Sequence, residues 1–204
     1  MPETEALLPR FRAAHTQVLG ISVDSIFCHA NWAHSLGGIS FPLLADFHPK
    51  GQVAQSYGLY LGDAGITDRA TVIIDAGGTV RHASAVTPAG RRDIGELAAL
   101  CEKVDAEYGS GLADFPSPAG LGKVDALYVK SNCGHSLKAI LGRDNLHLQG
   151  QVALKNVTED SAAMGQLNSL TGKDQAPCLV VDGKPMPEAD DIVRYFASHA
   201  TDIG

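Results

Sequence analysis

Short apolar runs of strand length recur along the second half of the chain and alternate with stretches of helical period. This pattern is typical of an α/β protein. The expected elements, in order, are strand 125–129, helix 136–142, strand 151–157, helix 162–170, strand 179–182 and helix 190–199. They form a strand–helix–strand unit over 125–157, followed by helix 162–170 and then a strand and a helix.

The first half also has an α/β pattern. Residues 17–25 are an apolar run that ends in turn residues, and a helical stretch follows at 28–33. The next segments are 41–46, 54–59, a strand at 69–75, an extended stretch at 77–81 and a helix at 90–105. Together these elements predict a second, separate α/β domain.

Between Tyr108 and Lys123 the chain is rich in Gly, Pro and Ser and has no periodicity. Such a composition predicts a linker over 108–123 that joins a domain of residues 1–107 to a domain of residues 124–204. A tether of this kind raises the effective concentration of one domain around the other to about millimolar.

Composition narrows the function classes. The 45% hydrophobic content is sufficient for packed cores, and the net charge of −7 argues against nucleic acid as a partner. The basic pair Arg91-Arg92 is interpreted as a solvated helix start. No apolar run approaches the roughly 20 residues of a membrane span. The acidic start is unlike a signal peptide, and four cysteines without framework spacing indicate a cytoplasmic protein.

Cys133 lies where a strand passes into a helix, directly after an apolar run that ends at Val129. Unpaired N–H groups and the helix dipole favour the thiolate there, which predicts a nucleophile near neutral pH. The alternative is a buried structural thiol. Ser136 stands where a dithiol motif has its second cysteine. Any disulfide of Cys133 therefore needs a partner thiol, and glutathione is the obvious candidate.

Downstream, Ala176-Pro177 leads into an apolar strand, and an acid-rich helix start contains Asp190 and Asp191. With Cys-Gly-His-Ser, this order resembles a glutaredoxin, or equally the thioredoxin-like domain of glutathione transferases. The resemblance implies a cis Pro177 facing the cysteine, a basic position at Lys130, and a peptide-binding turn at Ala176 and Pro177. It also implies that Asp190 and Asp191 hold the γ-glutamyl end of glutathione, a co-substrate, with no tightly bound cofactor. Both carboxylates are alternatively favourable charges in a first helical turn.

Four elements of the first half form a specific combination: Ser-Val-Asp-Ser from residue 22, Pro-Leu-Leu-Ala-Asp from residue 42, Tyr57-Gly58, and Arg69-Ala70 before Ile-Ile-Asp. Their order resembles the peroxiredoxins, nearest to the alkyl hydroperoxide reductase and one-cysteine branches. The resemblance implies peroxide reduction, with Arg69 as the active-site arginine. It places the peroxide-reactive cysteine immediately before Met1. The strand that carries this cysteine is then missing, so the first half is expected to expose strand edges or apolar surface and to self-associate.

The other three cysteines have simpler interpretations. Cys178 lies within an apolar strand and is interpreted as core, and Cys101 as core or interface. Cys28 follows Ser25, a plausible N-cap, and is interpreted as a packing cysteine, with a redox-relay thiol as the alternative. No metal site is predicted, because Cys28, His29 and His34 share no helical face.

The combined prediction is a peroxiredoxin–glutaredoxin hybrid of two thioredoxin-like domains. The family activity is glutathione-dependent peroxide reduction, of which glutathione-linked thiol exchange at Cys133 remains in this chain. Expected partners are glutathione and peroxide or glutathionylated thiols, in a homo-oligomer without nucleic acid or membrane. One alternative is a monothiol iron–sulfur carrier, since Cys-Gly-His-Ser is near the Cys-Gly-Phe-Ser of such carriers. Another is a non-catalytic dimerising module.

Overall fold

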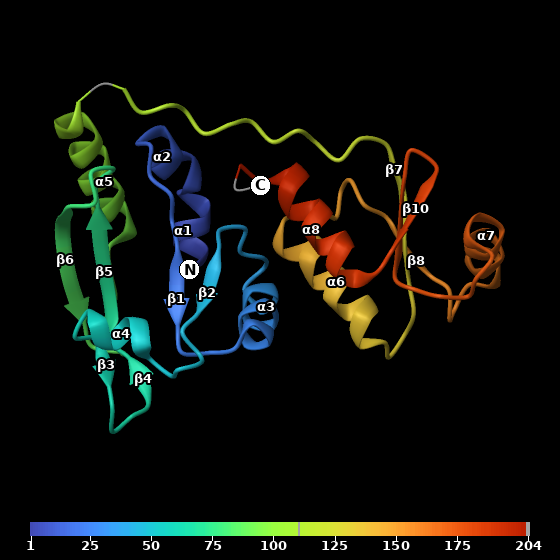
Figure 1. Cartoon of the computed structure of the whole chain (residues 1–204), viewed down its shortest axis with the longest axis horizontal. Helices are drawn as coiled ribbons and strands as arrows, with labels where there is room; N and C mark the ends of the chain where they lie inside the picture. The colour runs from blue at the N-terminus through green and yellow to red at the C-terminus, as the bar shows by residue number, and fades with distance from the viewer. Residues whose placement is uncertain (110, 203–204) are drawn as a thin grey trace. The chain divides into compact units, whose positions relative to one another are not determined.

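The structure is a computed structural model that describes residues 1–109 and 111–202 (Figure 1). It divides into two compact units, one of Met1–His29 with Phe41–Phe115 and the other of Ala30–Ser40 with Pro116–Gly204. Ser110 in the predicted linker and residues 203–204 lie outside the described residues. The sequence did not predict that residues 30–40 group with the second unit. The domain boundaries 1–107, 108–123 and 124–204 stay a prediction.

The first unit contains short helices and paired strands. Its elements are α1 (Pro2–Ala6), α2 (Leu8–Ala13), β1 (Gly20–Ser22), the first turn of α3 (Ile26–Ser35), β2 (Leu43–Ala45), α4 (Gln52–Ser56), β3 (Tyr60–Leu61), β4 (Ile66–Thr67), β5 (Arg69–Ile74), β6 (Val80–Val86) and α5 (Ile94–Tyr108). The expected helix 90–105 begins later, because the Asp93 side chain caps α5 by accepting the Glu96 N–H at 2.9 Å.

The strands of the first unit form three separate two-stranded sheets. β1 and β2 are parallel, whereas β3 with β4 and β5 with β6 are antiparallel. The strand expected over 17–25 is shorter in the structure, where β1 covers Gly20–Ser22 and pairs with β2. Four large apolar side chains at or next to the strands are about half exposed: Leu19, Ile21, Ile74 and Val80. The expectation of exposed apolar surface in this half is confirmed.

The core of the first unit lies between α2, α5 and β5. Phe11, Ile73, Ala98 and Cys101 are buried together there, which confirms the core interpretation of Cys101. On the surface the Arg10 guanidinium donates to the Glu102 carboxylate at 2.9 Å and joins α2 to α5. The two helices therefore cover β5 as one layer.

The second unit contains the element order that the sequence predicts. Its elements after residue 116 are β7 (Val124–Val129), α6 (Gly134–Asn145), β8 (Leu154–Asn156), α7 (Ser161–Thr171), β9 (Cys178–Val181), β10 (Lys184–Pro187) and α8 (Ala189–Ala200). The sheet has the order β10-β9-β7-β8. β7 and β8 are parallel, whereas β9 is antiparallel to β7 and to β10. The α/β class is thus confirmed.

Helices cover both faces of this sheet, and β7 alternates between two cores. Leu127 and Val129 pack with residues of α6 and α8, including Ala139 and Phe196. Ala126 and Tyr128 pack on the other face with residues of α7, where Cys178 is also buried. Figure 1 shows α6 and α8 side by side on one face and α7 on the other. A strand with two buried faces has the continuous apolar run seen at residues 126–129.

Part of the predicted linker is packed against the second unit. Leu121 is buried in the core on the α6 and α8 face. Its carbonyl accepts the Tyr195 hydroxyl at 2.5 Å, and the Gly120 N–H donates to the His199 carbonyl at 2.8 Å. One apolar side chain among glycines thus anchors the backbone at residues 120–121 to α8, while the linker bounds 108–123 stay a prediction.

None of the helices in the described part of the chain has the length and apolar character needed to cross a membrane.

Candidate functional site

Cys133 is the N-cap residue of α6, at the end of the loop that follows β7. Asn132, directly before it, has a left-handed backbone with φ 55, a conformation that asparagine tolerates better than most residues. The Cys133 carbonyl accepts the first helical hydrogen bond, from the Leu137 N–H at 2.9 Å. The side chain is half-buried and in no disulfide. The predicted strand-to-helix position of this thiol is confirmed.

The pKa of the Cys133 thiol is lowered from its ordinary value. The largest cause is the backbone N–H of Ser136, followed by the Ser136 hydroxyl. Partial burial acts in the opposite direction, and the His135 N–H and the Lys130 charge lower the pKa further. These donors belong to the first turn of α6, where unpaired N–H groups stabilise a negative charge. The lowered pKa favours the thiolate form of Cys133 at a lower pH than for an ordinary cysteine.

Ser136 is fully buried beneath this turn. Its hydroxyl accepts the Lys130 N–H at 3.0 Å, so its own proton is available for the sulfur of Cys133. The structure thus brings together three of the predicted site residues, namely Cys133, Ser136 and Lys130. Their catalytic and binding roles stay predictions.

The remaining site residues of the second unit lie at the starts of β9 and α8. The Ala176–Pro177 peptide bond is cis, and Pro177 is buried directly before β9. Asp190 and Asp191 lie in the first turn of α8. Asp190 pairs with Lys138 of α6, which lowers the Asp190 pKa, and Asp191 pairs with Arg194 at 2.8 Å. Both carboxylates are thus already engaged by cations from the protein.

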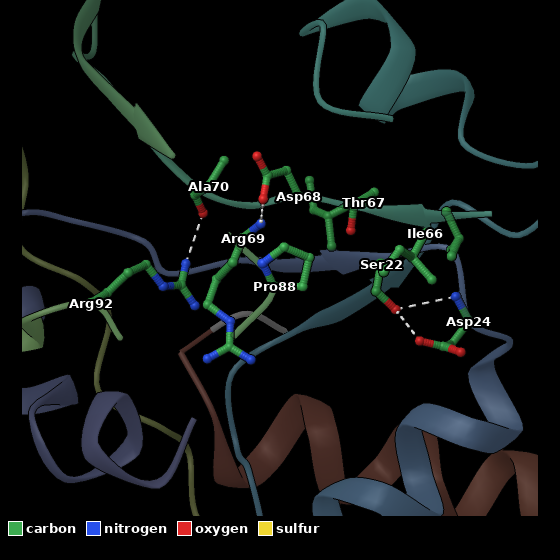
Figure 2. A pocket seen from close by; sticks show the side chains of 11 residues that line it. Ser22, Asp24, Ile66, Thr67, Asp68, Arg69, Ala70, Pro88 and Arg92 are labelled. Atoms are coloured by element: carbon green, nitrogen blue, oxygen red, sulfur yellow. Dashed lines mark hydrogen bonds between the residues drawn. The ribbon is translucent and has the colours of Figure 1, made fainter. Parts of the chain in front are cut away.

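Arg69 lies in the first unit, where a cavity of about 330 Å³ separates β1 from the start of β5 (Figure 2). Its guanidinium donates to the Gly90 carbonyl at 3.0 Å. At the far side of the cavity the Ser22 hydroxyl donates to the Asp24 carboxylate at 2.8 Å. Arg69 and Cys133 belong to different units, and their shared role in one catalytic set stays a prediction.

Arg92 is a lining residue that the sequence interpretation missed. The sequence indicates a solvated pair with Arg91, whereas Arg92 is half-buried and donates to the Ala70 carbonyl at 2.7 Å (Figure 2). Burial, and then the nearby Arg69 charge, lower the Arg92 pKa. Two guanidinium groups, those of Arg69 and Arg92, therefore lie close together here, and no local motif around Arg92 indicates it.

The other thiols lack the environment of Cys133. Burial raises the pKa of Cys101 and of Cys178, and Cys178 is 1% exposed, which confirms its core interpretation. Cys28 is exposed, so its interpretation as a packing cysteine is wrong. Its N–H donates to the Ser25 hydroxyl at 3.3 Å, which confirms Ser25 as the cap. Among the described residues no three His, Cys, Asp or Glu side chains gather in a way that could hold a metal ion.

Comparison with known proteins gives a family match for the first half. Residues 1–83 match the model of the AhpC/TSA family. The alkyl hydroperoxide reductase E of Mycobacterium tuberculosis (strain H37Rv) is 41% identical over 86 residues, which are 42% of this chain and 56% of that protein. Peroxiredoxin-4 of Bos taurus is 41% identical over 81 residues, which are 37% of this chain and 29% of that protein.

A solved structure, Mycobacterium tuberculosis AhpC, is 26% identical with a TM-score of 0.48 and is matched over 54% of this chain and 62% of its own. The chain thus spans about half the length of the first of these relatives and less of the second. The peroxiredoxin resemblance is confirmed over residues 1–83.

Proposed function

We propose that this protein is a thiol–disulfide oxidoreductase of peroxide metabolism, in which an AhpC/TSA-like first part is fused to a glutaredoxin-like module over residues 124–204. Cys133 is its nucleophile, and glutathione is its co-substrate. The match of residues 1–83 supports the first half of this proposal. The environment of Cys133 supports the second half.

One observation carries the proposal. Cys133 has two stabilising contacts from Ser136, its backbone N–H and its hydroxyl, together with the positive charge of Lys130. A thiolate is the nucleophile in disulfide exchange, and a lowered pKa raises its fraction at neutral pH. Cys101 and Cys178 have raised pKa values because they are buried. The chemistry is therefore assigned to Cys133.

The proposed reaction has two exchange steps. In the first, the Cys133 thiolate attacks the glutathione sulfur of a mixed disulfide, forms a Cys133–glutathione disulfide and releases the partner as a thiolate, which takes a proton from solvent. In the second, a glutathione thiolate attacks that glutathione sulfur, releases glutathione disulfide and regenerates the Cys133 thiolate. Ser136 is a serine, so no second motif thiol competes with this route.

The binding roles follow the glutaredoxin resemblance. Ala176 and Pro177 would pair with the cysteinyl backbone of glutathione, Lys130 would face a carboxylate, and Asp190 with Asp191 would hold the γ-glutamyl ammonium. Asp190 is paired with Lys138, and Asp191 with Arg194. The ligand ammonium would therefore replace a lysine or arginine rather than enter an empty site.

The match of residues 1–83 supports peroxide reduction as the activity of the intact family, of which glutathione-linked exchange at Cys133 is the step proposed for this chain. Arg69 would steady a thiolate and the peroxide, and Arg92 beside it would add positive charge at the same cavity. In that mechanism, a cysteine sulfenic acid condenses with the glutathione thiol, forming a mixed disulfide and releasing water, and Cys133 would then attack the glutathione sulfur of this disulfide. The exposed apolar side chains of β1, β5 and β6 support self-association of this part.

The test is release of glutathione from a glutathionylated cysteine peptide by the full chain in the presence of glutathione. Turnover is expected, and Cys133→Ser is expected to reduce it at least about a hundredfold. Cys28→Ser, which removes the exposed thiol of the first unit, is the matched control and should leave turnover unchanged. Turnover that survives in Cys133→Ser would contradict the proposal.

A further inference from the structure

Ser131, in the loop before Cys133, is the centre of a hydrogen-bond network with the loop after β8. Its hydroxyl donates to the Glu159 carboxylate at 2.7 Å and accepts from the Asn156 side-chain amide at 2.8 Å. Its backbone N–H donates to the Thr158 hydroxyl at 3.1 Å. Ser131 thus has three polar contacts, one to the last residue of β8 and two to the loop that follows it.

Strand pairing brings this loop to the site. β7 and β8 are parallel, with Val129 opposite Asn156 at their ends. The Val157 N–H continues the pairing to the Val129 carbonyl at 2.9 Å. The Asn156 side chain also accepts the Thr158 N–H at 3.0 Å, so the loop is itself held in shape. Because both strands end at the same edge of the sheet, the loop of β8 faces the loop that leads to Cys133.

The loop before Cys133 is therefore held from two sides. The Ser136 hydroxyl accepts the Lys130 N–H from the α6 side, and the Thr158 hydroxyl accepts the Ser131 N–H from the β8 side. Between these anchors and the helix lies Asn132, whose left-handed backbone turns the chain into α6. A residue in that conformation persists where its neighbours fix it.

We propose that Ser131, held by Glu159, is a positioning residue that fixes the Lys130–Asn132 loop so that the Cys133 sulfur faces the first N–H groups of α6. This inference rests on the proposed function, since it concerns the same thiol. Neither Ser131 nor Glu159 is needed in the chemistry. They act through the backbone of the loop.

The charged groups around Cys133 allow positioning to be separated from a simple charge effect. Lys130 lies on its own loop, His135 on α6, Glu159 on the loop after β8, and the Lys138–Asp190 pair joins α6 to α8. If Glu159 acted by its negative charge alone, neutralising it would favour the thiolate. If Glu159 acts by holding Ser131, a neutral side chain that keeps the acceptor oxygen leaves the Cys133 thiolate as stable as before. Removal of that acceptor oxygen then disfavours the thiolate.

The experiment measures the pH dependence of Cys133 labelling by iodoacetamide in the full chain. Ser131→Ala and Glu159→Ala are expected to move the profile to higher pH and to slow labelling at neutral pH about threefold to tenfold, since one pKa unit is a factor of ten in thiolate. Ser131→Thr and Glu159→Gln, which keep the hydroxyl and the acceptor oxygen, should stay within about twofold of the wild type.

The matched control is Ser169→Ala, which removes a serine hydroxyl bonded at 2.9 Å to the Gly165 carbonyl within α7. It should leave the profile unchanged. Unchanged profiles in both Ser131→Ala and Glu159→Ala, or a faster Cys133 in Glu159→Gln, would overturn the proposal. If one variant does not fold, the other decides.

Turnover of the glutathionylated peptide by the wild type is measured in parallel. No turnover, with labelling that responds to Ser131, rejects the proposed function and keeps the positioning role. Normal turnover, with a Cys133 labelling profile that does not change in Ser131→Ala or Glu159→Ala, rejects the positioning role alone.

Discussion

The hydroxyl of Ser136, a fully buried residue in the first turn of α6, accepts the Lys130 N–H at 3.0 Å. The contact joins the helix start to the loop on the other side of Cys133. It leaves the hydroxyl proton for the Cys133 sulfur. One buried serine therefore fixes the loop and stabilises the thiolate.

Replacing Ser136 is expected to weaken both functions. Ser136→Ala removes one of the two largest causes of the lowered Cys133 pKa and leaves the Lys130 N–H without its acceptor. We predict that Cys133 labelling at neutral pH slows about threefold to tenfold and that the unit loses about 1–3 kcal/mol of stability. Labelling kinetics and hydrogen exchange of α6 measure the two effects. Wild-type kinetics in this variant would show that the helix N–H groups alone suffice.

Arg92 and Arg91 are predicted to differ although they are neighbours. Arg92 is half-buried and donates to the Ala70 carbonyl and the Thr71 hydroxyl, whereas the Arg91 side chain is 89% exposed. Arg92→Ala should lower the opening free energy of β5 amides by about 1–3 kcal/mol. Arg91→Ala, its matched control, should change it by less than about 0.5 kcal/mol. An equal change of the opening free energy in the two variants would mean that the Arg92 hydrogen bonds do not stabilise β5.

His15 gives the first unit a pH dependence with a definite sign. The Asp105 carboxylate, 2.9 Å from His15 Nδ1, is the main cause of a raised His15 pKa. A His15 pKa that is higher in the folded state than in the unfolded state stabilises the fold when His15 is protonated. This stabilisation is fully present below the unfolded-state pKa of about 6.5 and is lost as pH rises through the folded-state pKa.

We therefore predict that hydrogen-exchange protection of α5, measured between about pH 6 and pH 9, falls more in the wild type than in His15→Gln. The exchange rates are first corrected for the intrinsic pH dependence of amide exchange. Parallel curves for the two proteins would exclude this contribution.

Leu121 tests the packing of the predicted linker. Its side chain is 3% exposed in the core with Phe196 and Leu127. Leu121→Ala should therefore destabilise α8 by about 2–5 kcal/mol, read from hydrogen exchange of its amides. Leu112→Ala, in the same Gly-rich stretch but only half-buried, should cost less than about 1 kcal/mol. An unchanged stability of α8 in Leu121→Ala would support a free tether at this position.

Much of the second unit could be predicted from the sequence. The run at residues 126–129 is apolar on both faces, which is the pattern of a central strand between two helical layers. Cys133 followed by glycine marks the helix start that the structure has. These features are local, so periodicity and capping reveal them.

The features that the sequence did not reveal depend on distant contacts. Arg92 is half-buried because it reaches the Ala70 carbonyl, and Leu121 because it meets α8. Ser131 has no motif, and its partners lie about 27 residues further along the chain. Pairing of β7 with β8 is needed to bring these groups together, and no single segment encodes it.

The most direct test of the account is the pH dependence of iodoacetamide labelling at each of the four cysteines of the full chain, read by peptide mass spectrometry with and without glutathione disulfide. We predict that Cys133 labels at lower pH than Cys101 and Cys178 and forms a glutathione adduct. If Cys133 instead labels like an ordinary thiol while Cys28 is the reactive one, the assignment of the chemistry to the second unit is contradicted.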